Sequence, residues 1–373
     1  MPLYHSSASV LGLCSVLNTG ATLSLGKKFS TKTFWQECRA TNATIIQYVG
    51  ETCRYLLAAP PQFDPVTGVN LDKANSVRMA FGNGLRPDIW NRFKERFDIE
   101  VIAEFYSATE GASSSWNYSK NDFAKGAIGR NGLFGWLMLS QTWAPVALDW
   151  ETETPFRDPV TGFCSRVKPG EPGEMLYKLN EKDIESSFQG YHNNSSSSSS
   201  KVMRDVFVKG DAYFRSGDMI AWDNEGRTYF NDRIGDTFRW KSENVSTTEV
   251  SEALGRHPAV QEANVYGVEL PHHDGRAGCV AIVLSEPPSE TLLSHLAAHA
   301  LQSLPRFAVP LFLRFCKDMQ LTGTNKQQKH IVRQQGVDPA KTGDDEIFWL
   351  KNGTYVKFNN KDWDELNGGR VKL

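Results

Sequence analysis

The sequence lacks the cysteine patterns of a structural metal site or a disulfide framework. Its six cysteines, spread over 373 residues, include no Cys-x-x-Cys pair and no short repeat spacing, which zinc sites and small disulfide scaffolds require. This usage fits a reducing compartment. His295 and His299 have the i, i+4 spacing of zinc-binding helices, but the glutamate that serves metalloproteases as a base is missing between them. They indicate an ordinary helix face.

An excess of charge of one sign is also absent, and so are long hydrophobic runs. Lys and Arg number 41 and Asp and Glu 43, for a net charge of −2, which gives no electrostatic reason to expect a nucleic acid partner. No apolar run reaches the roughly 18 residues that span a bilayer, so we expect no transmembrane helix in this chain. Residues 8–17 imitate a signal-peptide core without a preceding Lys or Arg, and we expect a buried helix there.

The length predicts more than one domain, because a single hydrophobic core rarely serves more than about 250–300 residues. We expect two domains followed by a tail. The first covers residues 1–233 and the second residues 234–340. Residues 341–373 show no clear core signal and are expected to form the tail.

Helical and strand patterns alternate through the first hundred residues. Apolar residues at helical spacing predict helices at 10–17, 30–40 and 87–97, the second capped by Ser30 or Thr31. Alternating or β-branched segments predict strands at 21–25, 43–49 and 99–105. This order predicts a layered α/β domain.

The middle and the end of the chain show other patterns of secondary structure. Residues 126–236 carry short strand patterns between glycine and proline turns, which favours a distorted β-barrel or a small sheet. Within them, the serine run 195–200 cannot bury apolar area and is expected to form a mobile surface loop. Farther on, helices at 247–254 and 288–301 and strands at 260–268 and 278–284 predict a compact α+β unit.

Two polar motifs could carry chemistry. Tyr106-Ser107-Ala108-Thr109-Glu110-Gly111 directly follows a predicted buried strand, and α/β sheets bind ligands outside the carboxyl ends of their strands. A hydroxyl beside a carboxylate can bond a phosphate and hold Mg²⁺, although a polar strand-to-helix turn is the favoured interpretation of this motif when it stands alone. Asp218 has a carboxylate that can accept two hydrogen bonds at once, or it can belong to a Gly-Asp hairpin turn.

The segment 232–250, DRIGDTFRWKSENVSTTEV, resembles the signature of the fatty acid transport proteins and very-long-chain acyl-CoA synthetases, a branch of the adenylate-forming enzymes. Similar motifs occur in the family's order from Met1 to about Pro339. The resemblance implies an α/β fold in which a partial large adenylate-forming domain, layered α/β with a small β-barrel-like part, precedes a small α+β C-terminal domain.

The resemblance also implies roles for residues in the large domain. Tyr106 would lie against adenine, Thr109 would bond the ATP phosphates, and Glu110 would hold Mg²⁺. Gly82, Asn83 and Gly84 resemble the loop that passes along the adenine and acyl pocket.

Further roles concern the ribose and the chemical step. Asp218 would accept hydrogen bonds from both ribose hydroxyls, and Arg233 would also reach the ribose. Arg239, within the signature segment, joins the expected nucleotide-binding residues. The polar residues around Lys326 indicate a solvated lysine when the segment is considered alone. By resemblance, however, Lys326 matches the family's catalytic lysine, which enters the active site from the small domain and therefore implies domain closure.

The implied activity is the ATP-dependent conversion of a long- or very-long-chain fatty acid to acyl-CoA, coupled to fatty acid uptake, with Mg²⁺ as cofactor and coenzyme A as co-substrate. The parent protein would be membrane-associated at the cytoplasmic face of the endoplasmic reticulum, peroxisome or plasma membrane, and assembly into a homo-oligomer is compatible with the resemblance. The family's Gly-rich, lysine-ended phosphate loop is missing from the sequence, so we expect an N-terminally truncated member. A non-catalytic fatty acid- or nucleotide-binding form stays open as the alternative.

Overall fold

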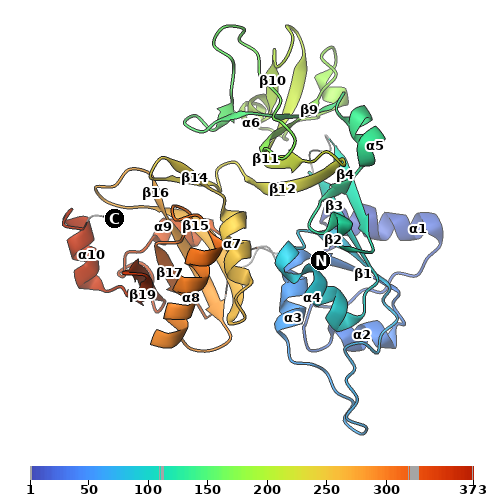
Figure 1. Cartoon of the computed structure of the whole chain (residues 1–373). Coiled ribbons are helices and arrows are strands. Elements are labelled where there is room, and N and C mark those ends of the chain that lie inside the picture. The colour runs from blue at the N-terminus through green and yellow to red at the C-terminus, as the bar shows by residue number, and fades with distance from the viewer. Residues whose placement is uncertain (1, 109, 111–112, 318, 320–326, 372) are drawn as a thin grey trace. The chain divides into compact units, whose positions relative to one another are not determined.

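The computed structural model of the chain describes residues 2–108, 110, 113–317, 319, 327–371 and 373 (Figure 1). The chain divides into two compact units, Met1–Ile234 and Gly235–Leu373. Each unit has its own sheets and its own buried apolar clusters. The mixed α/β architecture is the expected one.

The first sheet of the first unit has the strand order β1-β2-β3-β4. Its strands are β1 (Ile45–Val49), β2 (Met79–Asn83), β3 (Val101–Ser107) and β4 (Ser114–Ser119). The first three run parallel and β4 pairs antiparallel with β3. The carboxyl ends of β1, β2 and β3 therefore meet at one edge of the sheet.

Helices α2 (Phe34–Ala40), α3 (Gly50–Ala58) and α4 (Pro87–Phe97) accompany this sheet. The prediction for α4 is confirmed at both ends. Pro87 starts it, since a missing N–H costs nothing in the first turn, and Asp98 ends it in a left-handed conformation with φ 55°. Its apolar face is buried as the sequence periodicity indicated, through Ile89, Trp90, Phe93 and Phe97.

Three expectations for the first forty residues need correction. The N-terminal segment is helical, as η1 (Ser7–Cys14) and α1 (Ser15–Thr19), but it is not buried, because Val10 is 56% and Leu17 72% exposed. Residues 21–25 form no strand. Helix α2 begins at Phe34 rather than at residue 30, and the side chain of its N-cap residue Thr33 makes no capping bond.

The second sheet of this unit follows the order β5-β12-β11-β9-β6, with β10 also paired to β11. Within the described chain it is open, with β5 and β6 as its ends, so the small-sheet alternative holds and the barrel-like part is not closed. Its strands are β5 (Gly129–Arg130), β6 (Trp143–Val146), β9 (Gly173–Lys178), β10 (Val202–Arg204), β11 (Ala212–Trp222) and β12 (Arg227–Arg233).

Shorter elements lie around this second sheet. Helix α5 (Gly132–Leu139) precedes β6, and β7 (Leu148–Asp149) pairs with β8 (Thr154–Pro155). The serine run is a short helix, α6 (Ser195–Ser200), rather than the expected loop. The reason is local, because the Asn194 side chain accepts a hydrogen bond from the N–H of Ser197 and caps the helix. Two 3₁₀ turns are η2 (Asp122–Ala124) and η3 (Ile184–Ser186).

The second unit is built on a sheet with the order β15-β16-β17-β18-β19. The expected helices and strands between 247 and 301 are confirmed, and Ser246 caps α7 by accepting from the N–H of Glu249 at 3.2 Å. The helices and strands of the second unit are β13 (Phe238–Trp240), β14 (Glu243–Val245), α7 (Thr247–Gly255), β15 (Val260–Glu269), β16 (Arg276–Leu284), α8 (Glu290–Ser303), β17 (Phe312–Phe315), α9 (His330–Gln335), β18 (Glu346–Lys351), β19 (Thr354–Lys357) and α10 (Asn360–Asn367).

Residues 341–373 are not a tail without a core. Strand β18 pairs antiparallel with β17, and β19 completes that edge of the sheet. Trp349 is 1% and Tyr355 2% exposed, inside the same cluster as Phe312. The short apolar run Ile347 to Leu350 was the available signal, but the polar residues around it obscured the strand. Among the described residues, no helix has the length and apolarity needed to cross a bilayer.

Candidate nucleotide-binding site

The loop formed by the end of β2 and the residues that follow it is shaped by two glycines at the carboxyl edge of the first sheet. Gly84 has a φ of 80°, a conformation that side chains disfavour. A Cβ on Gly82 would lie 2.2 Å from the carbonyl oxygen of Tyr48 on the neighbouring strand. Both positions therefore require glycine. This loop contains the residues expected along adenine.

A buried glutamate that sequence reasoning missed holds this loop. Glu104, on β3, is 2% exposed. Its carboxylate accepts hydrogen bonds from the Tyr48 hydroxyl, from the N–H of Gly84, and from the N–H of Leu85 at 3.1 Å. The signal was a lone acid within an otherwise apolar strand, which is costly unless the acid is bonded.

Burial raises the pKa of Glu104 to about 8, against the opposing effect of the Tyr48, Leu85 and Gly84 hydrogen bonds. Burial, together with Glu104 itself, also raises the pKa of the nearby Tyr48 hydroxyl and of the Cys53 thiol. A raised folded-state pKa means that the native state holds its proton longer than the unfolded chain. The stability this carboxyl contributes is then complete below its unfolded pKa of 4.5 and is lost as the pH rises through about 8.

We expect Glu104→Gln to flatten the pH dependence of stability. Between pH 5 and pH 8 the free energy of unfolding of the unsubstituted protein should fall by several kcal/mol more than that of the variant, at about 1.4 kcal/mol per unit of pKa difference. Denaturant titrations at several pH values measure this. Glu100→Gln is the matched control, because Glu100 is exposed and paired with Lys120 at 2.7 Å. Parallel profiles for the protein and Glu104→Gln would refute the assignment.

Tyr106, Asp218 and Arg233 come together although 112 positions separate the first two. The Tyr106 hydroxyl donates to Oδ2 of Asp218 at 2.6 Å, and Nε of Arg233 lies 3.4 Å from Oδ1. Asp218 and Arg233 face each other across β11 and β12. Pairing of β11 with β9 is interrupted between Arg215 and Met219, and Gly217 there has a φ of 76°. This irregularity is typical of functional strand positions.

Asp218 sits in a mixed electrostatic environment. Burial raises its pKa, while the Tyr106 hydrogen bond and the charges of Arg233 and Lys201 oppose the rise. The charge of Glu110 adds to it, so the two carboxylates are close enough to interact. Lys201, whose Nζ donates to the carbonyl of Ser216 at 3.3 Å, was not anticipated. It follows a serine run and carries no sequence signal of its own.

Glu110 has a partner that the motif did not reveal. The Tyr191 hydroxyl donates to Oε1 of Glu110 at 2.7 Å. Burial and this bond raise the pKa of Tyr191 to about 12, so the phenol stays a neutral donor at physiological pH. Tyr191 thus orients the carboxylate for which the family resemblance predicts a magnesium-binding role.

The remaining predicted residues are distributed as follows. Asn83 ends β2, and its Oδ1 is buried with no hydrogen-bond partner among the described residues. Arg239 lies on β13, in the second unit. Thr109 and Lys326 lie outside the described residues, so their roles stay predictions.

Comparison with known proteins identifies the family. The model of the AMP-binding enzymes matches residues 1–191, and that of the AMP-binding enzyme C-terminal domain matches residues 249–326. The first match covers half of the chain, and the chain belongs to this family. Its resemblance to the fatty acid transport proteins is confirmed as well. The very long-chain fatty acid transport protein of Cochliobolus heterostrophus is 43% identical over 378 residues, covering 100% of this chain and 57% of that relative.

A second relative and one solved structure agree. The very long-chain fatty acid transport protein of Saccharomyces cerevisiae is 43% identical over 380 residues, covering 100% of this chain and 56% of its own length. ATP-bound MatB from Rhodopseudomonas palustris superposes with a TM-score of 0.67 at 20% identity, over 90% of this chain and 58% of that one. This likeness shows the fold. The chain spans a little over half the length of the relatives it matches.

Proposed function

We propose that the protein converts a long- or very-long-chain fatty acid to its coenzyme A thioester with ATP, through an acyl-adenylate. The observation that carries this proposal is the buried Asp218 carboxylate, held between the Tyr106 hydroxyl and Arg233 in a chain of the AMP-binding family. The names of the similar fatty acid transport proteins support the substrate class and a link to fatty acid uptake.

Binding of the nucleoside would use the residues already assembled. The ionised Asp218 can accept hydrogen bonds from both ribose hydroxyls, and Arg233 lies on the adjacent strand position to reach the same sugar. The hydrogen bond from the Tyr106 hydroxyl to Asp218 fixes the Tyr106 ring, which would stack on adenine. The unpartnered Oδ1 of Asn83 suits the exocyclic amino group of adenine. Arg239 would add a further nucleotide contact.

The phosphates and the metal would lie near Glu110 and Thr109. Mg²⁺ is usually held by one or two carboxylates together with substrate phosphates and waters, so the single carboxylate of Glu110, oriented by Tyr191, fits it. The described residues contain no cluster of three or more acidic, His or Cys ligands. Bound Mg²⁺ would neutralise phosphate charge, and the Thr109 hydroxyl would bond the phosphates.

The chemistry would proceed in two displacements. A carboxylate oxygen of the fatty acid attacks the α-phosphorus of ATP, and the bond from that phosphorus to the bridging oxygen breaks, releasing pyrophosphate. The coenzyme A thiolate then attacks the acyl carbon, and the bond between that carbon and the AMP oxygen breaks. Lys326 would neutralise charge between the carboxylate and the α-phosphate in the first step, where fixed charges contribute most.

The alternative is a non-catalytic protein that binds nucleotide and fatty acid. It would use the same contacts of Tyr106, Asp218 and Arg233 to hold a nucleoside, without turnover. Association with the cytoplasmic face of a membrane, at the endoplasmic reticulum, peroxisome or plasma membrane, and assembly into a homo-oligomer belong to the proposal in either case.

We expect Glu110→Gln to raise the KM for Mg·ATP by about 10- to 100-fold, since removing a charged ligand costs about 1.5–3 kcal/mol. The assay supplies palmitate, Mg·ATP and coenzyme A to the purified chain and quantifies palmitoyl-CoA by mass spectrometry. Glu181→Gln, at an exposed turn, is the control. An unchanged KM would remove Glu110 from the site. Steady turnover by the unsubstituted chain would eliminate the binding-only alternative, whereas ATP binding without product would favour it.

A further inference from the structure

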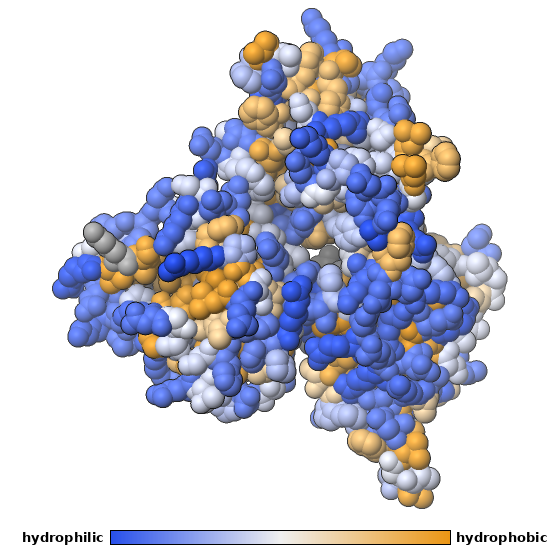
Figure 2. Space-filling view, viewed as in Figure 1, coloured by the Kyte–Doolittle hydropathy of each residue, from blue (hydrophilic) through white to orange (hydrophobic). Residues whose placement is uncertain are grey.

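Helix α5 presents a large apolar face to solvent. Its side chains at i, i+1, i+4 and i+5 share that face, and they are exposed by 67%, 83%, 62% and 76% at Leu133, Phe134, Leu137 and Met138. In Figure 2 they form an orange protrusion at the position of α5 in Figure 1. The sequence has no Asp, Glu, Lys or Arg between Arg130 and Asp149. Contiguous exposed apolar surface of this kind marks an interaction site.

The helix is fixed in this orientation by its other face. Trp136 is 7% exposed and stacks on Trp222 with 4.6 Å between ring centroids. It also meets the ring of Trp143 edge-on at 6.4 Å. Aromatic packing of this type adds to the area buried. The outward residues therefore cannot turn inward without breaking the tryptophan cluster.

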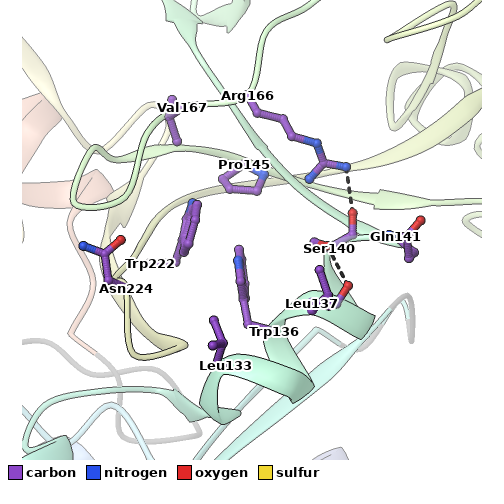
Figure 3. Close-up of a pocket in the computed structure, with 10 residues that line it drawn as sticks. All are labelled: Leu133, Trp136, Leu137, Ser140, Gln141, Pro145, Arg166, Val167, Trp222 and Asn224. Atoms are coloured by element: carbon purple, nitrogen blue, oxygen red, sulfur yellow. Dashed lines mark hydrogen bonds between the residues drawn. The ribbon is translucent and has the colours of Figure 1, made fainter.

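A pocket of about 620 Å³ continues the apolar face toward the sheet (Figure 3). Leu133 and Leu137 line one side of it, and Pro145, Val167 and Trp222 line the other. The lining includes the Arg166 guanidinium and no carboxylate.

The charges around this face are complementary to an anionic surface. Arg166 donates to the carbonyls of Trp143 at 2.6 Å and Ser140 at 2.8 Å, which places its charge at the C-terminal end of α5. Arg130, which ends β5 two residues before the helix, is exposed. The carboxylates of the adjoining turn, Asp223 and Glu225, are both paired with Arg227.

We propose that α5 is the membrane-contacting element of this protein and inserts its outer face into the interfacial region of an anionic lipid bilayer. An interfacial helix buries its apolar side chains to a depth of about 5–10 Å while flanking cations meet the headgroups. Four protruding apolar side chains flanked by arginines favour an anionic lipid surface as the occupant of this face. The inference rests on the membrane association proposed above but not on the nucleotide chemistry, so it is tested without ATP and its failure is distinguishable from failure of the proposed reaction.

The test is co-sedimentation of the full 373-residue chain with phosphatidylcholine vesicles that contain or lack 30% phosphatidylserine. Binding is expected to be at least about 10-fold stronger on the anionic vesicles and to weaken with salt, since each nearby cation contributes about a factor of five. Phe134→Asp with Met138→Asp should reduce partitioning to anionic vesicles by at least about 10-fold. Phe134→Leu with Met138→Leu, which keeps the apolar area, should retain it.

The controls separate lipid contact from loss of folding and from self-association. Val66→Asp and Val160→Asp replace apolar residues that are each 91% exposed elsewhere in the unit, and they should leave partitioning unchanged. Thermal melts check that each variant is folded. Equal partitioning of the aspartate pair and the unsubstituted chain would overturn the proposal. It would also be overturned if those substitutions abolished only self-association in size-exclusion chromatography, which would make the face an interface between copies.

Discussion

Lys326→Ala is expected to lower the rate of acyl-adenylate formation by about 10³-fold. Removal of one preorganised charge from a developing anion typically costs 10²–10³ in rate, and here the lost ammonium would neutralise both the fatty carboxylate and the α-phosphate. The measurement is fatty-acid-dependent exchange of labelled pyrophosphate into ATP, which reports the first displacement alone.

The matched control is Lys341→Ala, because Lys341 is an exposed lysine of the same unit, 3.5 Å from Asp338. It should leave the exchange rate within about two-fold, as exposed pairs contribute little. A Lys326→Ala variant should still convert synthetic acyl-adenylate to acyl-CoA, since that displacement takes place at the acyl carbon and no longer requires a carboxylate to approach the α-phosphate. Exchange at the unsubstituted rate would remove Lys326 from the mechanism.

Asp218→Ala is expected to weaken AMP binding by about 100-fold or more. The carboxylate would accept two hydrogen bonds from the ribose, and bonds to a charged acceptor contribute about 1.5–3 kcal/mol each. Isothermal titration calorimetry with AMP measures this without turnover. The same titration with 2′-deoxy-AMP tests the ribose contact directly. The unsubstituted protein should bind the deoxy nucleotide more weakly than AMP, whereas the variant should bind both equally.

Tyr106→Phe provides the matched control for Asp218. It removes the 2.6 Å hydrogen bond to the carboxylate but keeps both the ring and the charge, so the preference for AMP over 2′-deoxy-AMP should persist. If Asp218→Ala bound AMP as tightly as the unsubstituted protein, or kept its discrimination, the ribose assignment would fail and the proposed nucleotide site with it.

Sequence periodicity was sufficient to predict a helix or strand where one face of that element is buried and the other is polar. Helix α4 alternates buried Phe93 and Phe97 with charged residues, and its Pro87 start is a local property of the chain. Strands β15 and β16 were also predicted, because each contains several β-branched residues, which favour strands. The motif ending in Glu110 was also visible, since it follows a buried strand.

Sequence periodicity predicted the wrong secondary structure or burial where these depend on contacts with segments far away in the chain. Residues 21–25 alternate like a strand but pair with no strand among the described residues. In contrast, β18 forms by pairing with β17, and β19 forms by pairing with β18. The burial expected of the N-terminal helix was wrong for the same reason, because amphipathic patterning does not specify a partner. The serine run was the opposite case, because a loop was predicted and a helix formed. The Asn194 side chain caps that helix by accepting a hydrogen bond from the N–H of Ser197.

By itself, the sequence determined the α/β alternation, the small C-terminal unit, the family and which polar residues are proposed to bind a nucleotide, since these depend on local pattern and motif. Only the tertiary structure decided that Asp218 meets Tyr106, that Tyr191 orients Glu110, that Glu104 holds the Gly84 loop, and that α5 turns its apolar face outward. The physical reason is that such contacts are set by strand pairing and by packing between segments far apart in the chain, which no local pattern encodes.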